Sequence, residues 1–461
     1  MIKEYVNSLR NKEFTATEKI KFYENKIKND KHNAVLEFFQ SAYKLAKQID
    51  GKIANGEELG CLAGVPIIIK DNILYDGHIA SAGSKMLEKF TAPYSATIVK
   101  KLLQEDAIII GRANMDEFAM GTTGENSAFG ATLNALSDKC VAGGSSSGSA
   151  VSVACGLCLG AIGTDTGGSV RVPAVNNGMF GIKPTYGTVS RYGIVAFASG
   201  LEQAGAICNT AEDTELLQNV ISGKDSFDGT LLDISSRKIN FDIKKLKIGV
   251  IKQIEKHKNT IQDYGKHEKL LEWFKGSGAT VKEISLPYLD LCLPTYYIIA
   301  TAEAASNLGR FDGIKYTSHE KDVTTTRTKF FGKEVKRRIM LGNFVLSSGY
   351  FDAFYGKAKK VQSAVRSAFI KAFEDVDCII MPVTLSDAGF IGEKTTNPVE
   401  MYLIDLFTVS ANIAGVPALA VPFEKGQKGL PIGFQIIGKH FDEPLLFEIA
   451  KYFQSNGGVK C

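Results

Sequence analysis

Apolar residues recur along the chain in patterns that predict alternating strands and helices. Short apolar runs bounded by polar residues or glycine predict buried strands, and apolar positions three and four residues apart predict amphipathic helices. The expected strands are residues 61–70, 107–111, 246–251, 279–284, 378–383, 418–421 and 431–437. The expected helices are residues 34–49, 95–105, 267–276, 296–308, 335–347, 353–373, 401–414 and 445–453. This alternation predicts a wound α/β sheet.

The same patterns suggest how the chain is divided. Residues 1–60 are expected to form an N-terminal segment of two or three helices with polar connections, and residues 61–461 one large domain. A helical excursion is expected around residues 290–375, and the polar, weakly periodic stretch 315–336 is expected to lie on the surface. A chain of 461 residues that is 44% hydrophobic can bury a sizeable core.

Composition narrows the class of protein. The 54 basic and 50 acidic residues leave a net charge of +4, too balanced to indicate nucleic-acid binding by itself. Residues 1–13 are charged and lack an apolar core, so we expect no signal peptide, and residues 141–164 are too rich in glycine and serine for a membrane span. We therefore expect no membrane association and a reduced, cytosolic-type compartment.

Cysteine and histidine spacing predicts no metal site. Of the eight cysteines, only Cys155 and Cys158 have CxxC spacing, and they lack a second pair or a neighbouring histidine. Their small apolar neighbours favour packed helix residues over a redox motif. The six histidines have no metal-ligand spacing and are expected to lie unpaired at the surface.

Residues 140–187 are dominated by glycine and serine and form the centre of the pattern. Gly143-Gly144-Ser145 opens the segment, a small-residue apolar stretch at 150–162 predicts a packed helix and a buried strand, and Gly167-Gly168-Ser169 follows. Three interpretations are a flexible linker, a phosphate cradle and a nucleophile loop. The apolar continuation disfavours a linker, and the sequence fits neither a P-loop nor G-x-G-x-x-G.

A nucleophile loop needs a base, and Lys70 is a candidate. It closes the apolar run 61–70, where a lysine more often extends its amine toward solvent. If its tip is enclosed instead, desolvation lowers its pKa and supplies a neutral amine. No G-x-S-x-G elbow is present for a Ser-His-Asp triad, so Ser169 with a lysine base is the favoured constellation. Backbone N–H groups beside Ser169 could form a nest for an oxyanion.

These motifs resemble the amidase signature family in one order from about residue 60 to 440. They are Gly64-Val65-Pro66, Lys70-Asp71-Asn72, Gly143-Gly144-Ser145-Ser146, residues 164–171, and Gly181 with Lys183-Pro184-Thr185. The resemblance implies an α/β amidase signature fold, a large mixed, mostly wound β-sheet covered by helices on both faces. One departure is Ser147, which stands where the family usually has glycine.

The resemblance also implies roles for individual residues. Ser169 would be the nucleophile, Ser145 a bridging serine behind a cis peptide bond, and Lys70 the base. The N–H groups of the loop would form the oxyanion hole. The residues contributing them would be Thr166, Gly167, Gly168 and Ser169. Asp165 and Arg171 look like a supporting pair for the nucleophile loop.

Further stretches are similar to family members that serve as the glutaminase component of tRNA-dependent amidotransferases. They are residues 114–121, 190–193, 296–300, 332–339, 346–350 and 405–408. This similarity implies hydrolysis of glutamine through a γ-glutamyl enzyme. Arg338 would bind the α-carboxylate of glutamine and Asp405 its α-ammonium group.

The similarity to amidotransferase members further implies a three-subunit enzyme. Ammonia would pass to a B subunit, where ATP activates mischarged Glu-tRNA(Gln) or Asp-tRNA(Asn), and a small C subunit would join the complex. ATP, Mg²⁺ and the aminoacyl-tRNA would be bound mainly by the partner, with no cofactor in this chain. The implied location is the cytoplasm, or an organellar matrix in a eukaryote.

Two alternatives remain at this point. A stand-alone amidase acting on small amides would share Lys70, Ser145 and Ser169 but would not need Arg338 or Asp405. A non-catalytic ligand-binding protein would need neither the lysine nor two serines at matching positions.

Overall fold

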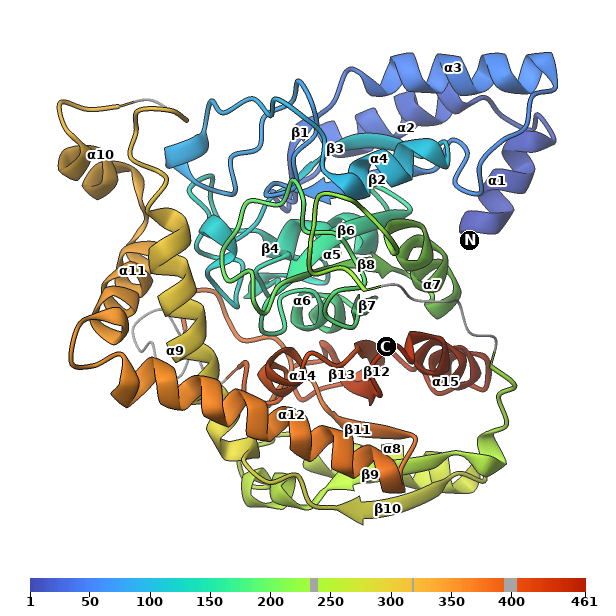
Figure 1. The fold of residues 1–461 in the computed structure, drawn as a ribbon. Helices are drawn as coiled ribbons and strands as arrows, with labels where there is room; N and C mark the ends of the chain where they lie inside the picture. The colour runs from blue at the N-terminus through green and yellow to red at the C-terminus, as the bar shows by residue number, and fades with distance from the viewer. Residues whose placement is uncertain (233–238, 317–318, 394–403) are drawn as a thin grey trace.

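A mixed β-sheet runs through the molecule and carries many of its buried apolar side chains (Figure 1). The computed structural model describes residues 1–232, 239–316, 319–393 and 404–461. Within these residues eleven strands pair in the order β1-β3-β2-β6-β8-β7-β12-β13-β11-β9-β10. Their bounds are β1 (Val35–Phe38), β2 (Pro66–Lys70), β3 (Ile108–Ala113), β6 (Gly160–Asp165), β7 (Phe180–Lys183), β8 (Gln203–Cys208), β9 (Lys247–Ile251), β10 (Thr280–Ile284), β11 (Cys378–Pro382), β12 (Ala418–Lys425) and β13 (Pro431–Gly438). A separate hairpin pairs β4 (Leu133–Asn134) with β5 (Ser137–Val141).

Strand directions divide the sheet into wound and antiparallel parts. Strand β2 runs parallel to β3 and β6, and β9 runs parallel to β10 and β11. The strands between these groups pair antiparallel from β6 through β8, β7, β12 and β13 to β11. Every residue of β2, β3, β6 and β8 is buried, as continuous apolar runs predict for strands covered on both faces. The predicted α/β fold with a large mixed sheet is confirmed.

Helices cover both faces of this sheet. Alternate residues of β2 face opposite ways, since Ile67 packs with α4, α7 and α15 whereas Ile68 packs with α2, α3 and α5. Helices α9, α11, α12 and α14 form a third apolar cluster against the C-terminal strands. The helix bounds are α1 (Ile2–Arg10), α2 (Ala16–Lys28), α3 (Ala42–Asn55), α4 (Thr97–Gln104), α5 (Ser147–Ala154), α6 (Arg171–Asn176), α7 (Ala211–Ile221), α8 (Tyr264–Gly276), α9 (Leu289–Leu308), α10 (Val323–Phe330), α11 (Lys333–Leu346), α12 (Lys357–Asp375), α14 (Val409–Ala414) and α15 (Glu443–Ser455).

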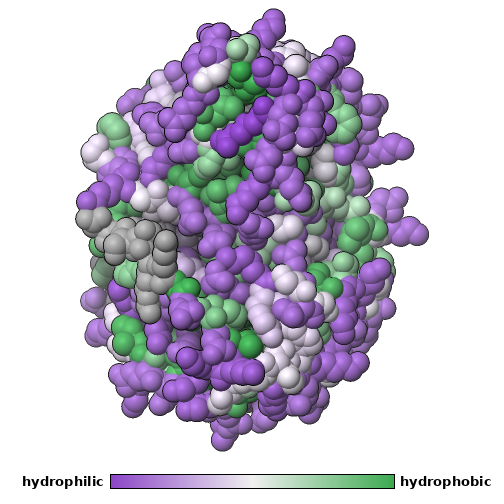
Figure 2. All heavy atoms as spheres, turned by 90° about the vertical axis from the view of Figure 1, so that its right-hand side faces the viewer, coloured by the Kyte–Doolittle hydropathy of each residue, from purple (hydrophilic) through white to green (hydrophobic). Residues whose placement is uncertain are grey.

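The outer surface is mostly polar. Figure 2 shows a hydrophilic face with scattered smaller apolar areas, on the side of the molecule to the right in Figure 1. None of the helices in the described part of the chain is long and apolar enough to cross a membrane.

Three predicted elements differ from the structure. The predicted helix 34–49 is wrong at its start, because residues 35–38 form β1 and pair with β3 at the sheet edge before α3 begins. The polar stretch 315–336 contains α10, whose first turn is capped by the carboxylate of Asp322. The predicted helix 401–414 is reduced to α14 among the described residues, and residues 401–403 lie outside them. Strand β8 and helix α7 were not predicted.

Candidate active site

Lys70 ends β2 with its side chain fully buried. Parallel pairing of β2 with β6 places Thr164 beside it. The Lys70 amine donates to Ser145 Oγ at 2.8 Å, to Ser146 Oγ at 2.9 Å and to Thr164 Oγ1 at 3.0 Å. The structure therefore brings Lys70 and Ser145, which are far apart in sequence, into direct hydrogen-bond contact.

The surroundings of Lys70 make its amine a usable base. Burial lowers the pKa of Lys70 to about 7, although the carboxylates of Glu202, Asp116 and Asp165 oppose this shift. A substantial fraction of the amine is then neutral near pH 7. A neutral amine has the lone pair needed to accept a proton from a hydroxyl.

The loop that carries Ser145 is built against Asp116. The Gly144–Ser145 peptide bond is cis. Gly144 has no room for a side chain, since a Cβ there would lie 2.0 Å from an Asp116 carboxylate oxygen. Ser147, the departure from the family pattern, is buried in the first turn of α5 and donates to Thr132 Oγ1 at 3.1 Å. Its hydroxyl is therefore accommodated without leaving the loop.

Ser169 lies in the loop between β6 and α6, and 8% of its surface is exposed. The Ser146 N–H donates to the Ser169 carbonyl at 3.0 Å, which joins the two serine loops. A Cβ on Gly167 would lie 2.6 Å from the Tyr296 ring, and one on Gly168 would lie 2.4 Å from Thr408 Oγ1. Both glycines are therefore required by close packing.

The backbone N–H groups of this loop are not equivalent. Those of Thr166, Gly167 and Ser169 donate to no group in the part of the chain that the structure describes. The Gly168 N–H differs from the expectation for an oxyanion donor, because it already donates to Asp165 Oδ1 at 2.8 Å. Three free donors remain in the loop.

A buried ion pair holds the nucleophile loop in place, as predicted. Arg171 donates to both oxygens of Asp165, each at 3.0 Å, and both side chains are fully buried. Burial alone would raise the pKa of Asp165, but the charge and hydrogen bonds of Arg171 outweigh it and hold that pKa well below its usual range. Arg171 also donates to Gln435 and Asn412, which ties the loop to β13 and α14.

Arg338 and Asp405 lie close together although they come from different elements. Both are nearly fully buried, at 2% and 4% exposed. Tyr297 joins them, because its hydroxyl donates to Asp405 Oδ2 at 2.9 Å and its ring centre lies 5.4 Å from the Arg338 guanidinium. The neighbouring Tyr296 crowds Gly167 of the nucleophile loop, so this charged pair adjoins that loop. Arg338 also donates to Glu334 at 2.8 Å.

Burial raises the pKa of Asp405 to about 7, and the Tyr297 hydrogen bond and the Arg338 charge oppose this shift. A bound ammonium group would favour the ionised form further. The site thus offers one cation and one titratable anion to a small zwitterion.

Sequence reasoning missed several residues around Lys70 and Asp405. Thr164, Asp116 and Tyr297 lie within stretches quoted for the resemblance, but no local pattern marks their contacts. Glu202 has no motif signal at all. It is buried just before β8, which pairs with β6 next to Thr164, and burial raises its pKa while Lys70 opposes the shift.

Comparisons with known proteins agree with this geometry. The family model described as Amidase matches residues 18–447, so the chain belongs to the amidase signature family. The A subunit of the glutamyl-tRNA(Gln) amidotransferase of Caldanaerobacter subterraneus subsp. tengcongensis is 46% identical over 466 residues, covering 97% of this chain and 94% of that protein. The solved structure of the corresponding A subunit from Thermotoga maritima, also of a glutamyl-tRNA(Gln) amidotransferase, has a TM-score of 0.79 and 36% identity, covering 96% of this chain and 92% of that one.

The fold is also shared with a peptide amidase. The native peptide amidase from Stenotrophomonas maltophilia has a TM-score of 0.82 at 25% identity, covering 100% of this chain and 97% of that one. Fold similarity alone therefore does not distinguish an amidotransferase component from a stand-alone amidase.

Proposed function

We propose that this chain is the glutamine-hydrolysing A subunit of an amidotransferase that converts Glu-tRNA(Gln), or alternatively Asp-tRNA(Asn), to the amidated form. It is a glutamine-dependent enzyme of the carbon–nitrogen ligase class, as are its relatives with 44–47% identity over nearly the whole chain. The observation that carries the glutamine assignment is the buried Arg338–Tyr297–Asp405 group beside the nucleophile loop. A zwitterionic amino acid needs both charges at fixed positions.

In the proposed reaction, Ser169 Oγ attacks the side-chain amide carbon of glutamine. Its proton passes through the Ser145 hydroxyl to neutral Lys70, with which Ser145 is hydrogen-bonded. The free N–H groups of Thr166, Gly167 and Ser169 stabilise the oxyanion of the tetrahedral intermediate.

The intermediate then collapses. The C–N bond breaks, and the relay returns the proton to the leaving nitrogen, which departs as ammonia. Water, deprotonated through the same relay, hydrolyses the γ-glutamyl ester, releasing glutamate and restoring Ser169.

We place ATP, Mg²⁺ and most of the aminoacyl-tRNA contacts on a partner B subunit, with a C subunit completing the enzyme. The ammonia released here would be consumed there. This proposal rests on the names of the relatives, each of which is called the A subunit of an amidotransferase.

Replacing Arg338 or Asp405 with alanine is expected to raise KM for glutamine by roughly 10-fold or more, which corresponds to about 1.4 kcal/mol of lost binding. Arg338→Lys should not rescue it, because a guanidinium grips a carboxylate with two parallel hydrogen bonds. Amidation driven by added ammonia in the assembled enzyme should stay nearly unchanged, since ammonia bypasses this site. The measurement compares glutamine-driven with ammonia-driven amidation for each variant.

Two outcomes of that comparison would count against the proposal. Equal loss with both nitrogen donors would mean that Arg338 and Asp405 support the fold or a contact between subunits. Unchanged glutamine affinity together with hydrolysis of other small amides would favour the stand-alone amidase.

An apolar surface near α11 is a candidate contact for the partner subunits. It lies on the last turns of α11 and the following segment, and its members are exposed: Met340, Leu341, Phe344, Tyr350, Phe351 and Phe354. The Phe344 ring centre lies 4.6 Å from that of Tyr350 and 5.7 Å from that of Phe354. Lys357 and Lys360 follow in the first turn of α12, so the contacting partner segment would be apolar with acidic flanks.

Replacing Phe344 with serine is expected to weaken capture of the B and C subunits by at least about 10-fold, because a central aromatic anchor is lost. The chain itself should remain folded, as circular dichroism would verify. The matched control is Phe22→Ser, which removes an exposed ring on α2. Full capture by the Phe344 variant, or equal loss in the control, would reject this contact.

A further inference from the structure

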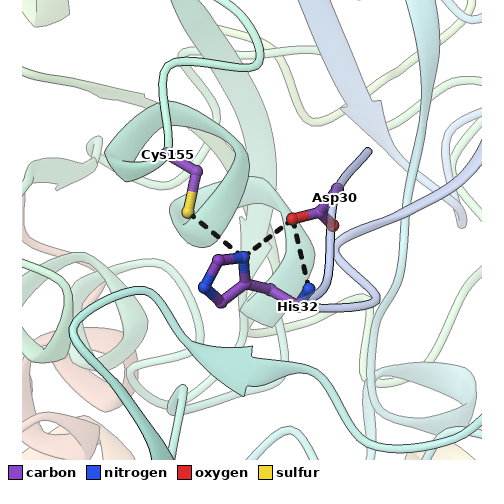
Figure 3. A group of neighbouring side chains, drawn as sticks. All are labelled: Asp30, His32 and Cys155. Carbon is purple, nitrogen blue, oxygen red and sulfur yellow. Dashed lines mark hydrogen bonds and ion pairs between the residues drawn. The ribbon is translucent and has the colours of Figure 1, made fainter. Parts of the chain in front are cut away.

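Asp30, His32 and Cys155 meet at a point that the active site does not use (Figure 3). Asp30 and His32 follow the end of α2, and Cys155 follows the end of α5. His32 Nδ1 lies 2.8 Å from Asp30 Oδ1 and 3.5 Å from Cys155 Sγ. The three atoms all lie within 4.8 Å of one another. Oxygen, nitrogen and sulfur donors therefore converge on one small volume.

This arrangement is not that of a catalytic triad. In a triad, one imidazole nitrogen contacts the nucleophile and the other contacts the carboxylate. Here the same atom, His32 Nδ1, contacts both Cys155 and Asp30. Burial also raises the pKa of the Cys155 thiol to about 11, so the sulfur is not an activated nucleophile. A convergent donor set that does not relay protons is better suited to holding a cation.

The surroundings favour a positive charge at this point. The carboxyl-terminal ends of α2 and α5 both lie here, and a helix carries partial negative charge at that end. Asp30 is held in place, because its oxygens accept from the backbone N–H groups of His32 at 3.2 Å and Ala34 at 3.1 Å. Lys26 lies nearby, but its amine donates to the Gly156 carbonyl at 2.8 Å rather than to the donor side chains.

Access is provided by an open hollow of about 670 Å³ that all three side chains line. His32 keeps 28% of its side chain exposed, whereas Asp30 keeps 6%. An ion and its water ligands can therefore reach the group from solvent without rearrangement of the core.

We propose that Asp30, His32 and Cys155 bind one divalent cation of the zinc class, with water completing the coordination. A zinc ion bound to sulfur and nitrogen separates those atoms by roughly 3.5 Å, which matches the distance between Cys155 and His32. The Asp30 oxygen would withdraw by about 0.5 Å to reach its own zinc bond. The sequence predicts no metal in this chain, because Cys155 is remote from the Asp-x-His pair along the chain.

Binding exchanges protons for the ion in a balanced step. The Cys155 S–H bond breaks, a sulfur–metal bond forms, and one proton is released to solvent. His32 stays neutral, since its proton moves from Nδ1 to Nε2 as Nδ1 binds the ion. The ion would fasten the end of α2 to the end of α5, the helix that follows the Ser145 loop.

The test is equilibrium dialysis of the full chain, first freed of metal with a chelator, against Zn²⁺ alone. We expect one ion per chain and release of about one proton, and Co²⁺ in its place should give a thiolate-to-cobalt absorption band. Cys155→Ser and His32→Gln should each weaken binding by at least about 10-fold and remove that band. The matched control is Cys61→Ser, which removes an exposed thiol elsewhere and should bind normally.

Asp30→Asn provides a third variant if either of the others fails to fold. Equal zinc affinity in the wild type, Cys155→Ser and His32→Gln would overturn the proposal. So would the absence of stoichiometric binding by the folded wild-type chain.

Discussion

Replacing Ser169 with alanine is expected to reduce glutamine hydrolysis by about 10³-fold or more, because the covalent route through the γ-glutamyl ester disappears. Only the hydroxyl is lost, and the packing of Gly167 and Gly168 against Tyr296 and Thr408 remains. The thermal midpoint should therefore change little. Steady-state glutaminase assays and mass detection of the acyl-enzyme give the two readouts.

A buried serine on the neighbouring helix supplies the control for this variant. Ser152 lies in α5, and its hydroxyl has no hydrogen-bond partner among the described residues, so Ser152→Ala should keep nearly full activity. Substantial turnover by rigorously pure Ser169→Ala would reject Ser169 as the nucleophile. A comparable loss in Ser152→Ala would show that the assay reports packing of this region rather than chemistry.

Local patterns were sufficient to predict the sheet strands nearest the site. The run at 61–70 predicted β2 and placed Lys70 at its end, because an unbroken apolar run is what a strand buried on both faces requires. The glycine- and serine-rich segment likewise predicted a packed helix and strand, observed as α5 and β6. What these patterns could not supply was the partner of each side chain. Glu202 and Asp116 reach Lys70 only after distant strands and loops pack together.

The wrong helix at 34–49 has a related cause. Its apolar spacing suits a helix, but residues 35–38 instead pair with the edge of β3, and Phe39 N–H donates to the Ile110 carbonyl at 2.8 Å. Tertiary pairing therefore overrode a local preference. The same dependence on distant partners hid the group formed by Asp30, His32 and Cys155, whose members share no motif.

Lys70→Ala is expected to cost about as much activity as Ser169→Ala, since the relay then has no base. Lys70 and Ser145 act as one unit through their 2.8 Å hydrogen bond, so the double Lys70→Ala, Ser145→Ala variant should be far less than multiplicatively worse than either single variant. Multiplicative effects of the two substitutions would argue that Lys70 is structural.

The pH profile separates chemistry from structure for the same residue. Only neutral Lys70 accepts a proton, and its pKa is lowered to about 7 by burial. Wild-type kcat/KM for glutamine should therefore rise by up to about 10-fold per pH unit below pH 7 and level off above it. The residual activity of Lys70→Ala should lack this acidic limb.

Lys183 provides a demanding control, because it too is fully buried with a pKa lowered to about 7. Its amine donates to the Pro184 carbonyl at 2.7 Å and to no serine hydroxyl in the described residues. Lys183→Met should therefore keep the acidic limb even if it loses stability. If the limb disappears with Lys183→Met and persists with Lys70→Ala, the titrating base is Lys183 and the relay proposed here is wrong.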